Sequence, residues 1–279
     1  MFLWGISWIS AKYISMHYAH VELAFWRFIL VSISSLISLK LLGLKLEKFS
    51  LIGLWWITLG AISMSLSQFA NFLGLEHGYA GFGSIVFNST SPLFSFLLAV
   101  LFFGKKLNNR EYIGLFIGAF GVMSIFRVWS MDMADIFNPS NIYFILNSIT
   151  FALTTIFAQL ASRYLNSATF SLGLGVVSSL LILPFCDNYK LFHIFSLDYI
   201  FWGHLIFNAA IAGGFGTTAY FFVVSKVGSD VASSYIFLTP LVSVVASYIV
   251  YGENIGFGVL FGAMFAMSAV YMLNSSKNR

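Results

Sequence analysis

Charged residues are scarce in this chain. Asp, Glu, Lys and Arg together make up 9% of its 279 residues, whereas soluble domains contain about 25%. Hydrophobic residues make up 59% and aromatic residues 19%, and a soluble protein of this length has too little interior to bury so much apolar surface. The composition therefore excludes a soluble protein and predicts an all-α integral membrane protein, for which the bilayer is the solvent.

Several signatures of chemistry are also missing. The single cysteine, Cys186, excludes an internal disulfide and a metal site built from cysteines alone. The chain contains no HExxH or GxSxG motif and no glycine-rich phosphate loop. His17 and His20 lie close together in the sequence but lack a third ligand, so we expect no metal site. Because the catalytic and phosphate-binding motifs are also missing, we expect no cofactor and no enzymatic activity.

Two further absences concern partners and processing. The basic residues are not interleaved with aromatic ones, so no nucleic-acid partner is expected. The first residues lack the basic segment that precedes the apolar core of a cleavable signal, so we expect no signal peptide.

Ten apolar stretches approach the length of about 20 residues that a helix needs to cross a bilayer. Short polar segments separate them, and none of these segments could form a soluble domain. The predicted spans are 2–17, 21–43, 54–75, 82–103, 110–127, 141–164, 168–186, 198–224, 231–251 and 255–274.

The distribution of lysine and arginine predicts the orientation of these spans. If the N-terminus is cytoplasmic, ten basic residues fall on the cytoplasmic side and two, Arg127 and Lys190, on the other. Such a bias follows the positive-inside rule, so we expect both termini in the cytoplasm and a location in a bacterial-type inner membrane. The ten are Lys40, Lys45, Lys48, Lys105, Lys106, Arg110, Arg163, Lys226, Lys277 and Arg279.

The chain also repeats itself. Ser91-Pro92-Leu93 followed by Gly104 matches Thr239-Pro240-Leu241 followed by Gly252, at a constant offset of 148 residues (91 to 239, 104 to 252). Because each unit holds five spans, the two units enter the membrane from opposite sides. The prediction is therefore two inverted five-helix repeats, residues 1–127 and 139–274, around a central cavity, an architecture typical of secondary transporters.

The same motifs carry a family resemblance. The segment 80–126 runs through Ser-Pro-Leu and Phe-Gly-Lys-Lys-Leu into a glycine-spaced helix, and the segment 233–273 repeats it; Trp4-Gly5, Lys12 and Phe25-Trp26-Arg27 precede them. The whole chain resembles the EamA family of the drug/metabolite transporter superfamily. The resemblance implies ten spans, a central cavity, a monomer and, as in most characterised members, export of amino acids or related metabolites. Lys105 departs from the family, which has an acidic residue there, whereas the second half keeps Glu253.

Polar residues recur on single faces of the predicted helices. Asn88 lies four residues after Ser84 and three before Ser91, which places all three on one face. An amide or hydroxyl in hydrocarbon needs a partner, so such faces are expected to point inward; hydrogen bonding between helices is their alternative role. The residues predicted to contact substrate are Trp4, Lys12, Gln68, Asn71, Asn88, Gln159, Tyr220 and Tyr235.

Two prolines occupy equivalent positions in the fourth and ninth spans, Pro92 and Pro240. Proline removes one backbone hydrogen bond and clashes with the carbonyl four residues before it. We predict that both helices kink beside the substrate, because freed carbonyls in a membrane usually face protein or a wet cavity. A packing kink with no role in transport is the alternative.

Apart from charges near the ends of the spans, Lys12 and Arg27 are the ionised side chains within the predicted spans. Charge inside a membrane is costly and points to function, so Lys12 is predicted to meet a carboxylate of the substrate, with snorkelling to the interface as the alternative. Arg27 is predicted to be structural, capping carbonyls or pairing with Glu22. Every Asp and Glu falls at a helix end or in a loop, and His204 is the remaining candidate proton carrier, so the sequence leaves proton coupling open.

The expected function is that of a secondary transporter of a small metabolite, an amino acid or a related compound, with export as the expected direction. Uptake or exchange of another metabolite or cofactor is the alternative. A channel or scaffold is a further one, although the sequence shows no filter loop or ring of charges. The expected partners are a small-molecule substrate and membrane lipid.

Overall fold

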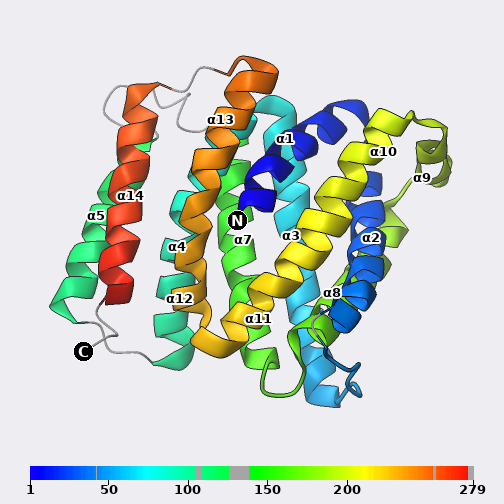
Figure 1. The fold of residues 1–279 in the computed structure, drawn as a ribbon, viewed down its shortest axis with the longest axis horizontal. Coiled ribbons are helices and arrows are strands. Elements are labelled where there is room, and N and C mark those ends of the chain that lie inside the picture. The colour runs from blue at the N-terminus through cyan, green and yellow to red at the C-terminus, as the bar shows by residue number, and fades with distance from the viewer. Residues whose placement is uncertain (42, 105–107, 126–137, 254–255, 276–279) are drawn as a thin grey trace.

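The chain folds into a bundle of long helices that cross the molecule from one end to the other (Figure 1). The computed structural model describes residues 1–41, 43–104, 108–125, 138–253 and 256–275, and none of these forms a strand. The helices are α1 (Phe2–His17), α2 (His20–Leu41), α3 (Leu51–His77), α4 (Ala80–Phe103), α5 (Asn109–Ile125), α7 (Pro139–Ala161), α8 (Ser167–Ile182), α9 (Asn188–His193), α10 (Tyr199–Ile206), the π-helical η3 (Phe207–Gly216), α11 (Thr217–Val227), α12 (Ser229–Ser234), the 3₁₀ segment η4 (Tyr235–Leu238), α13 (Thr239–Tyr251) and α14 (Phe257–Ser275), with 3₁₀ turns η1 (Leu183–Phe185) and η2 (Ile194–Ser196).

Six of the helical segments are long and apolar enough to cross a membrane. They are His20–Leu41, Leu51–His77, Ala80–Phe103, Pro139–Ala161, Ser167–Phe185 and Tyr199–Val227. Shorter apolar helices, Tyr112–Gly121, Val242–Tyr251 and Leu260–Ala269, lie at the predicted fifth, ninth and tenth spans. The first predicted span is the 16-residue α1, which is about 24 Å long and begins in the middle of the bundle (Figure 1). The chain is therefore a multi-pass helical membrane protein.

Two predicted spans contain irregular backbone. The eighth runs without a break from α10 through the π-helical η3 into α11. The ninth is divided by η4, after which α13 begins at Thr239 with Pro240 as its second residue. Proline fits the first turn of a helix, where its missing N–H is not needed. Pro92, in contrast, lies inside the uninterrupted α4.

The glycines of the repeated motif end their helices in the same way. Gly104 follows α4 with φ of +63°, and Gly252 follows α13 with φ of +65°. The left-handed conformation is nearly free of steric cost for glycine and closes a helix by satisfying its last carbonyls. The adjacent Lys105, with Lys106, Arg127, Lys277 and Arg279, lies outside the described residues.

Close helix packing around the Phe144 ring of α7 positions the centre of the bundle. Phe144 is fully buried, and a Cβ added to Gly74, Gly78 or Gly83 would lie within 3.0 Å of its ring. Glycines at the end of α3 and the start of α4 thus let both helices approach α7. The resulting contacts of α7 with α3 and α4 join segments from opposite halves of the sequence.

Candidate functional site

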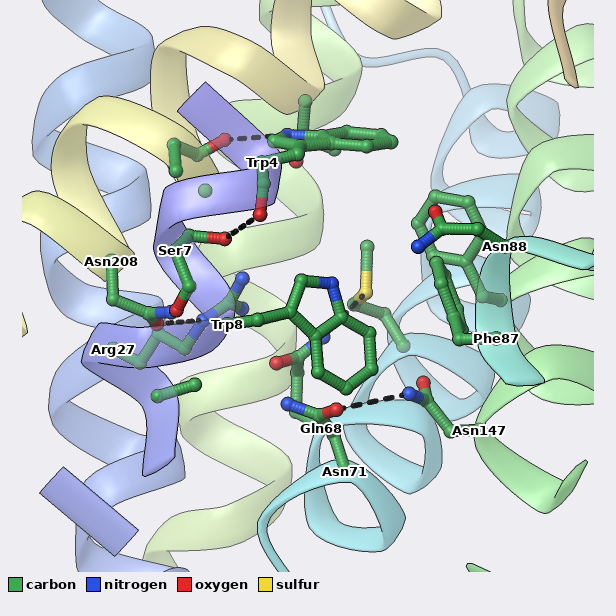
Figure 2. Close-up of a pocket in the computed structure, with 16 residues that line it drawn as sticks. Trp4, Ser7, Trp8, Arg27, Gln68, Asn71, Phe87, Asn88, Asn147 and Asn208 are labelled. Carbon is green, nitrogen blue, oxygen red and sulfur yellow. Dashed lines mark hydrogen bonds between the residues drawn. The ribbon is translucent and has the colours of Figure 1, made fainter. Parts of the chain in front are cut away.

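A polar cavity lies in the centre of the bundle, between α1, α2, α3, α4, α7, η3 and α11 (Figure 2). Its volume is about 80 Å³, which is room for several water molecules at about 10–15 Å³ each. The polar side chains that line it are Ser7, Arg27, Gln68, Asn71, Asn88, Asn147, Asn208 and Thr217. The apolar part of the lining consists of Trp4, Trp8, Ala11, Met64, Phe87, Phe151, Ala212 and Gly213.

One face of α1 forms an aromatic wall of the cavity. Trp4 and Trp8 lie one turn apart, and the Trp4 indole donates to the Ala212 carbonyl at 2.9 Å. Trp4 also meets Phe151 edge to face, with ring centroids 5.8 Å apart, and Trp8 lies 5.7 Å from the Phe87 ring. These contacts fix both indoles, so α1 presents a rigid apolar surface to whatever enters the cavity.

Arg27 is the cation of the cavity. Its Nε donates to the Asn208 side-chain oxygen at 3.1 Å, and Asn208 in turn donates to the Ser7 carbonyl at 3.1 Å. The residue is 9% exposed. The predicted pairing with Glu22 is wrong: the Glu22 carboxylate accepts instead from the Asp187 backbone N–H, at 2.8 Å. The side chain of Arg27, predicted to be structural, also lines the cavity.

Asparagine amides form a hydrogen-bonded strip along the opposite wall. Asn147 donates to Asn71 at 3.1 Å and accepts from Ser67 at 2.6 Å. Asn88 donates both to the Ser84 carbonyl and to its hydroxyl, at 2.6 and 2.9 Å. Its side-chain oxygen is buried and accepts no hydrogen bond within the described part of the chain. Among the described residues that oxygen therefore lacks a hydrogen-bond partner, and it is out of contact with solvent.

Lys12, predicted to meet a substrate carboxylate, meets a carboxylate of the protein instead. Its ammonium lies 3.0 Å from Glu253 and 3.1 Å from the Gly78 carbonyl. The Glu253 carboxylate also accepts from the backbone N–H groups of Ala80 and Gly81, at 2.9 and 2.8 Å. Lys12 is therefore part of a buried cap on the first turn of α4 and does not line the cavity.

The other predicted contacts divide into two groups. Trp4, Gln68, Asn71 and Asn88 all line the cavity (Figure 2). Tyr220 lies behind it, with its ring centroid 5.2 Å from that of Trp4.

Gln159 and Tyr235 lie away from the cavity. Gln159 accepts from the Ser229 backbone N–H at 2.8 Å, at the start of α12. Tyr235 is 51% exposed and lies in η4.

Five polar lining residues were not among the predicted contacts: Ser7, Arg27, Asn147, Asn208 and Thr217. Arg27 carried a usable signal, since intramembrane charge points to function. Asn208 lies in the π-helical η3, and such segments occur frequently at functional sites. Asn147 also carried a signal, since Ser140, Thr150 and Thr154 lie seven residues before, three after and seven after it, on the same face of α7.

The comparisons with known proteins agree that the chain resembles transporters. The model of the EamA-like transporter family matches residues 1–127 and 138–275. An uncharacterised transporter of Synechocystis is 24% identical over 98% of this chain and 87% of its own length, and one of Archaeoglobus fulgidus is 22% identical over 97% and 94%. An S-adenosylmethionine uptake transporter of Rickettsia bellii is 23% identical over 70% of this chain and 64% of its own length.

A solved structure shares the fold. It is the crystal structure of a protein 13% identical to this one, with a TM-score of 0.66 over 99% of this chain and 95% of the other. The family match covers both halves of the sequence. The relatives are named transporters, and they align with most of the length of this chain. The chain therefore belongs to the EamA-like transporter family and is a membrane transporter, not an enzyme.

Proposed function

We propose that this transporter is a secondary carrier of a small metabolite, an amino acid or a related compound, and that it works by alternating access around the central cavity. Export is the proposed direction. The observation that carries the proposal is the cavity itself: a polar, amide-rich space inside a membrane bundle, lined by both halves of the chain. Unpaired polar groups are expensive in a bilayer unless they face water or a ligand.

The helix contacts support two inverted five-helix repeats and ten spans. Under a two-fold relation between residues 1–127 and 139–274, the helices that lie next to the two-fold axis pack on their own counterparts. The contacts of α2 with α8, of α4 with α13 and of α5 with α14 follow that rule. A further match is that α4 packs on α7 as α13 packs on α1.

The ends of the bundle support the proposed orientation. The segments 43–50 and 162–166 and the junction of α11 with α12 lie at the same end in Figure 1. These segments or their neighbours carry Lys45, Lys48, Arg163 and Lys226, as a cytoplasmic face should. We therefore propose an inner-membrane monomer with both termini in the cytoplasm, surrounded by lipid.

The predicted site residues separate into two proposed roles. Trp4, Gln68, Asn71 and Asn88 contact the substrate, because they line the cavity. Tyr220 supports Trp4 from behind. Lys12 and Gln159 act at helix N-termini, α4 and α12 respectively.

The remaining predicted residues, Pro92, Pro240 and Tyr235, are proposed to shape the helices around the cavity. Pro92 lies one turn after Asn88 in α4, and Pro240 follows the η4 break. We propose that both shape the helices beside the substrate, and that Tyr235 belongs to this break.

Uptake is the second candidate direction. It is favoured by the S-adenosylmethionine uptake transporters of Rickettsia bellii, Rickettsia felis and Rickettsia conorii, which are 23%, 23% and 24% identical to this chain over about two thirds of its length. Exchange of an internal metabolite for an external one would combine export with uptake.

The test is uptake and counterflow of a labelled metabolite panel in proteoliposomes. We expect saturable flux that is stimulated by unlabelled substrate on the opposite side, as a carrier requires. Asn88→Ala should reduce flux at low substrate concentration roughly tenfold, because a lost hydrogen bond of about 1.4 kcal/mol corresponds to that factor. The matched control is Asn188→Ala, an exposed position at the start of α9, which should leave flux unchanged. Non-saturable flux would contradict the carrier, and full flux in Asn88→Ala would contradict the site.

A further inference from the structure

Arg27 is a buried cation without a counter-charge. It is 9% exposed, and its Nε is held by Asn208. No described carboxylate lies within ion-pairing distance, since the ion pairs of the structure join Lys12 to Glu253, and His20 and His77 to Glu76. A guanidinium inside a membrane is costly unless an anion compensates it.

The surroundings of Arg27 are built from neutral groups on every side. The π-helical η3 supplies Asn208 and Gly213, α1 supplies the Ser7 carbonyl that orients Asn208, and the Phe28 ring lies 5.9 Å away. Gly213 approaches so closely that a Cβ there would lie 3.0 Å from one Nη atom. The nearest acidic residue along α2, Glu22, is engaged by the Asp187 backbone.

The Nη groups remain available to a ligand. The hydrogen bond from Arg27 to a described residue is the one from Nε, so the outer edge of the guanidinium keeps its parallel pair of N–H donors. Arg27 lines the cavity. A planar guanidinium edge matches a carboxylate in a bidentate pair, and this match is stronger and more selective than a single hydrogen bond.

We propose that the cavity binds a carboxylate-bearing solute of zero or negative net charge, and that Arg27 is the residue that pairs with its carboxylate. The inference rests on the proposed transport function and names the substrate class of the same site. It moves the anion-binding role from Lys12, which Glu253 neutralises, to Arg27.

The rest of the cavity accommodates the remainder of such a solute. In Figure 2 Asn88 lies on the opposite side of the cavity from Arg27, with Trp8 between them. Amide side chains of the lining, such as Gln68 and Asn71, can accept from an ammonium or hydroxyl group, and the faces of Trp8 and Phe87 cover apolar atoms. A volume of about 80 Å³ corresponds to roughly five to eight water molecules, which is the scale of a small amino acid. A net cation fits poorly because, in the part of the chain that the structure describes, no acidic residue lines the cavity.

The first experiment compares acids with their amides on the wild-type protein. The probes are alanine, serine, threonine and proline, each beside its carboxamide and beside the amine that lacks the carboxyl group. The readout is the melting temperature of the purified chain in detergent. We expect at least one acid to raise it by about 5 °C at saturation and its amide and amine to have no effect. Stabilisation by an amide or an amine, or by none of the probes, would overturn the proposal.

The second experiment changes the cation. Arg27→Met should keep or raise the melting temperature of the ligand-free protein, because it removes an uncompensated buried charge, and should abolish the shift caused by the acid. Arg163→Met, at an exposed position, should change neither. A large loss of ligand-free stability in Arg27→Met, or a retained shift, would overturn the proposal. The acid–amide comparison decides the matter on its own if the variant does not fold.

Flux separates this inference from the transport function beneath it. Carboxylate-dependent stabilisation without flux in proteoliposomes would overturn the carrier and leave the anion site. Saturable flux of solutes that lack a carboxylate, unchanged in Arg27→Met, would overturn the anion site and leave the carrier.

Discussion

The Glu253 carboxylate joins three elements at one end of the bundle. It accepts hydrogen bonds from Lys12 in α1, from the first N–H groups of α4 and, at 2.7 Å, from Ser247 in α13. Its side chain is 3% exposed and that of Lys12 is 14% exposed. Removing one partner of a buried ion pair destabilises a protein more than the intact pair stabilises it, because the remaining charge stays buried.

Glu253→Gln should therefore destabilise the protein by about 3 kcal/mol, seen as a lower melting temperature in detergent. The amide leaves the Lys12 ammonium uncompensated and turns one acceptor of the helix cap into a donor. Replacing Lys12 with Met in the same variant should recover part of the loss, since the orphaned charge is then gone. An unchanged melting temperature in Glu253→Gln would show that the pair contributes nothing to stability.

Single residues also show how far the sequence could specify the cavity. The periodicity of α4 placed Asn88 correctly, because a helix face is defined by spacing alone. Lys12 and Arg27 are both lone charges in apolar stretches, and the sequence does not say which of them meets a charged partner within the protein. That partner, Glu253 for Lys12, is 241 residues away along the chain, and no local pattern encodes it.

At the scale of elements, the two ends of the bundle are held by different chemistry. The start of α4 is capped by the ionised Glu253, whereas the start of α12 is capped by the neutral amide of Gln159, through Ser229. The elements that carry these caps are counterparts under the proposed repeat. On that proposal, the two halves share a backbone plan and differ in the strength of the contacts that hold it.

The junction of α3, α4 and α7 provides a test of element packing. Gly83→Ala places a Cβ 2.5 Å from the Phe144 ring, which is fully buried and has no space to move aside. We expect a loss of about 1–3 kcal/mol, the usual range for overpacking, measured as a fall in melting temperature. The control is Gly203→Ala in α10, where a Cβ meets nothing within 4 Å and alanine should be neutral or mildly stabilising. Equal effects at both positions would contradict the packing argument.

Backbone irregularities mark the elements that the sequence described least well. The eighth span was expected to be a regular helix, but its centre is the π-helical η3, which carries Asn208 to the cavity. Gly214 within it packs so closely that a Cβ would lie 2.4 Å from Ser34. A π-helical segment depends on such tertiary contacts, since local propensity favours the α-helix throughout.

At the scale of the whole molecule, the proposed orientation can be tested with the native cysteine. Cys186 follows η1, just beyond the span Ser167–Phe185, and is partly exposed. The proposed topology places it outside the cell. Burial, followed by the charge of Glu22, raises the pKa of its thiol to about 11, so the neutral thiol dominates near neutral pH. The reactive thiolate then increases with pH up to about 11.

An impermeant maleimide added to spheroplasts should therefore label Cys186 from outside, slowly near neutral pH and about tenfold faster per pH unit toward the pKa. The control combines Cys186→Ala with Lys48→Cys, which lies at the proposed cytoplasmic end and should be labelled only after the membrane is opened. The reverse pattern would invert the topology. A rate that is already maximal near neutral pH would contradict the raised pKa of Cys186.

The sequence by itself determined the class of this molecule. Hydropathy decides whether a segment enters a bilayer, and the distribution of basic residues biases its orientation; both are sums over local composition. The repeated Ser/Thr-Pro-Leu and glycine motifs are likewise local, because a left-handed helix end needs glycine wherever it occurs. The membrane class and the family resemblance could therefore be inferred from local features of the sequence.

Only the tertiary structure decided which polar side chains meet. The cavity joins residues from 4 to 217, on seven elements, and its cation, amides and indoles are neighbours through packing alone. A buried charge takes its role from what compensates it, and compensation acts through space at a few ångströms. For that reason Lys12 became part of a helix cap, whereas Arg27 was left facing the space that a substrate would enter.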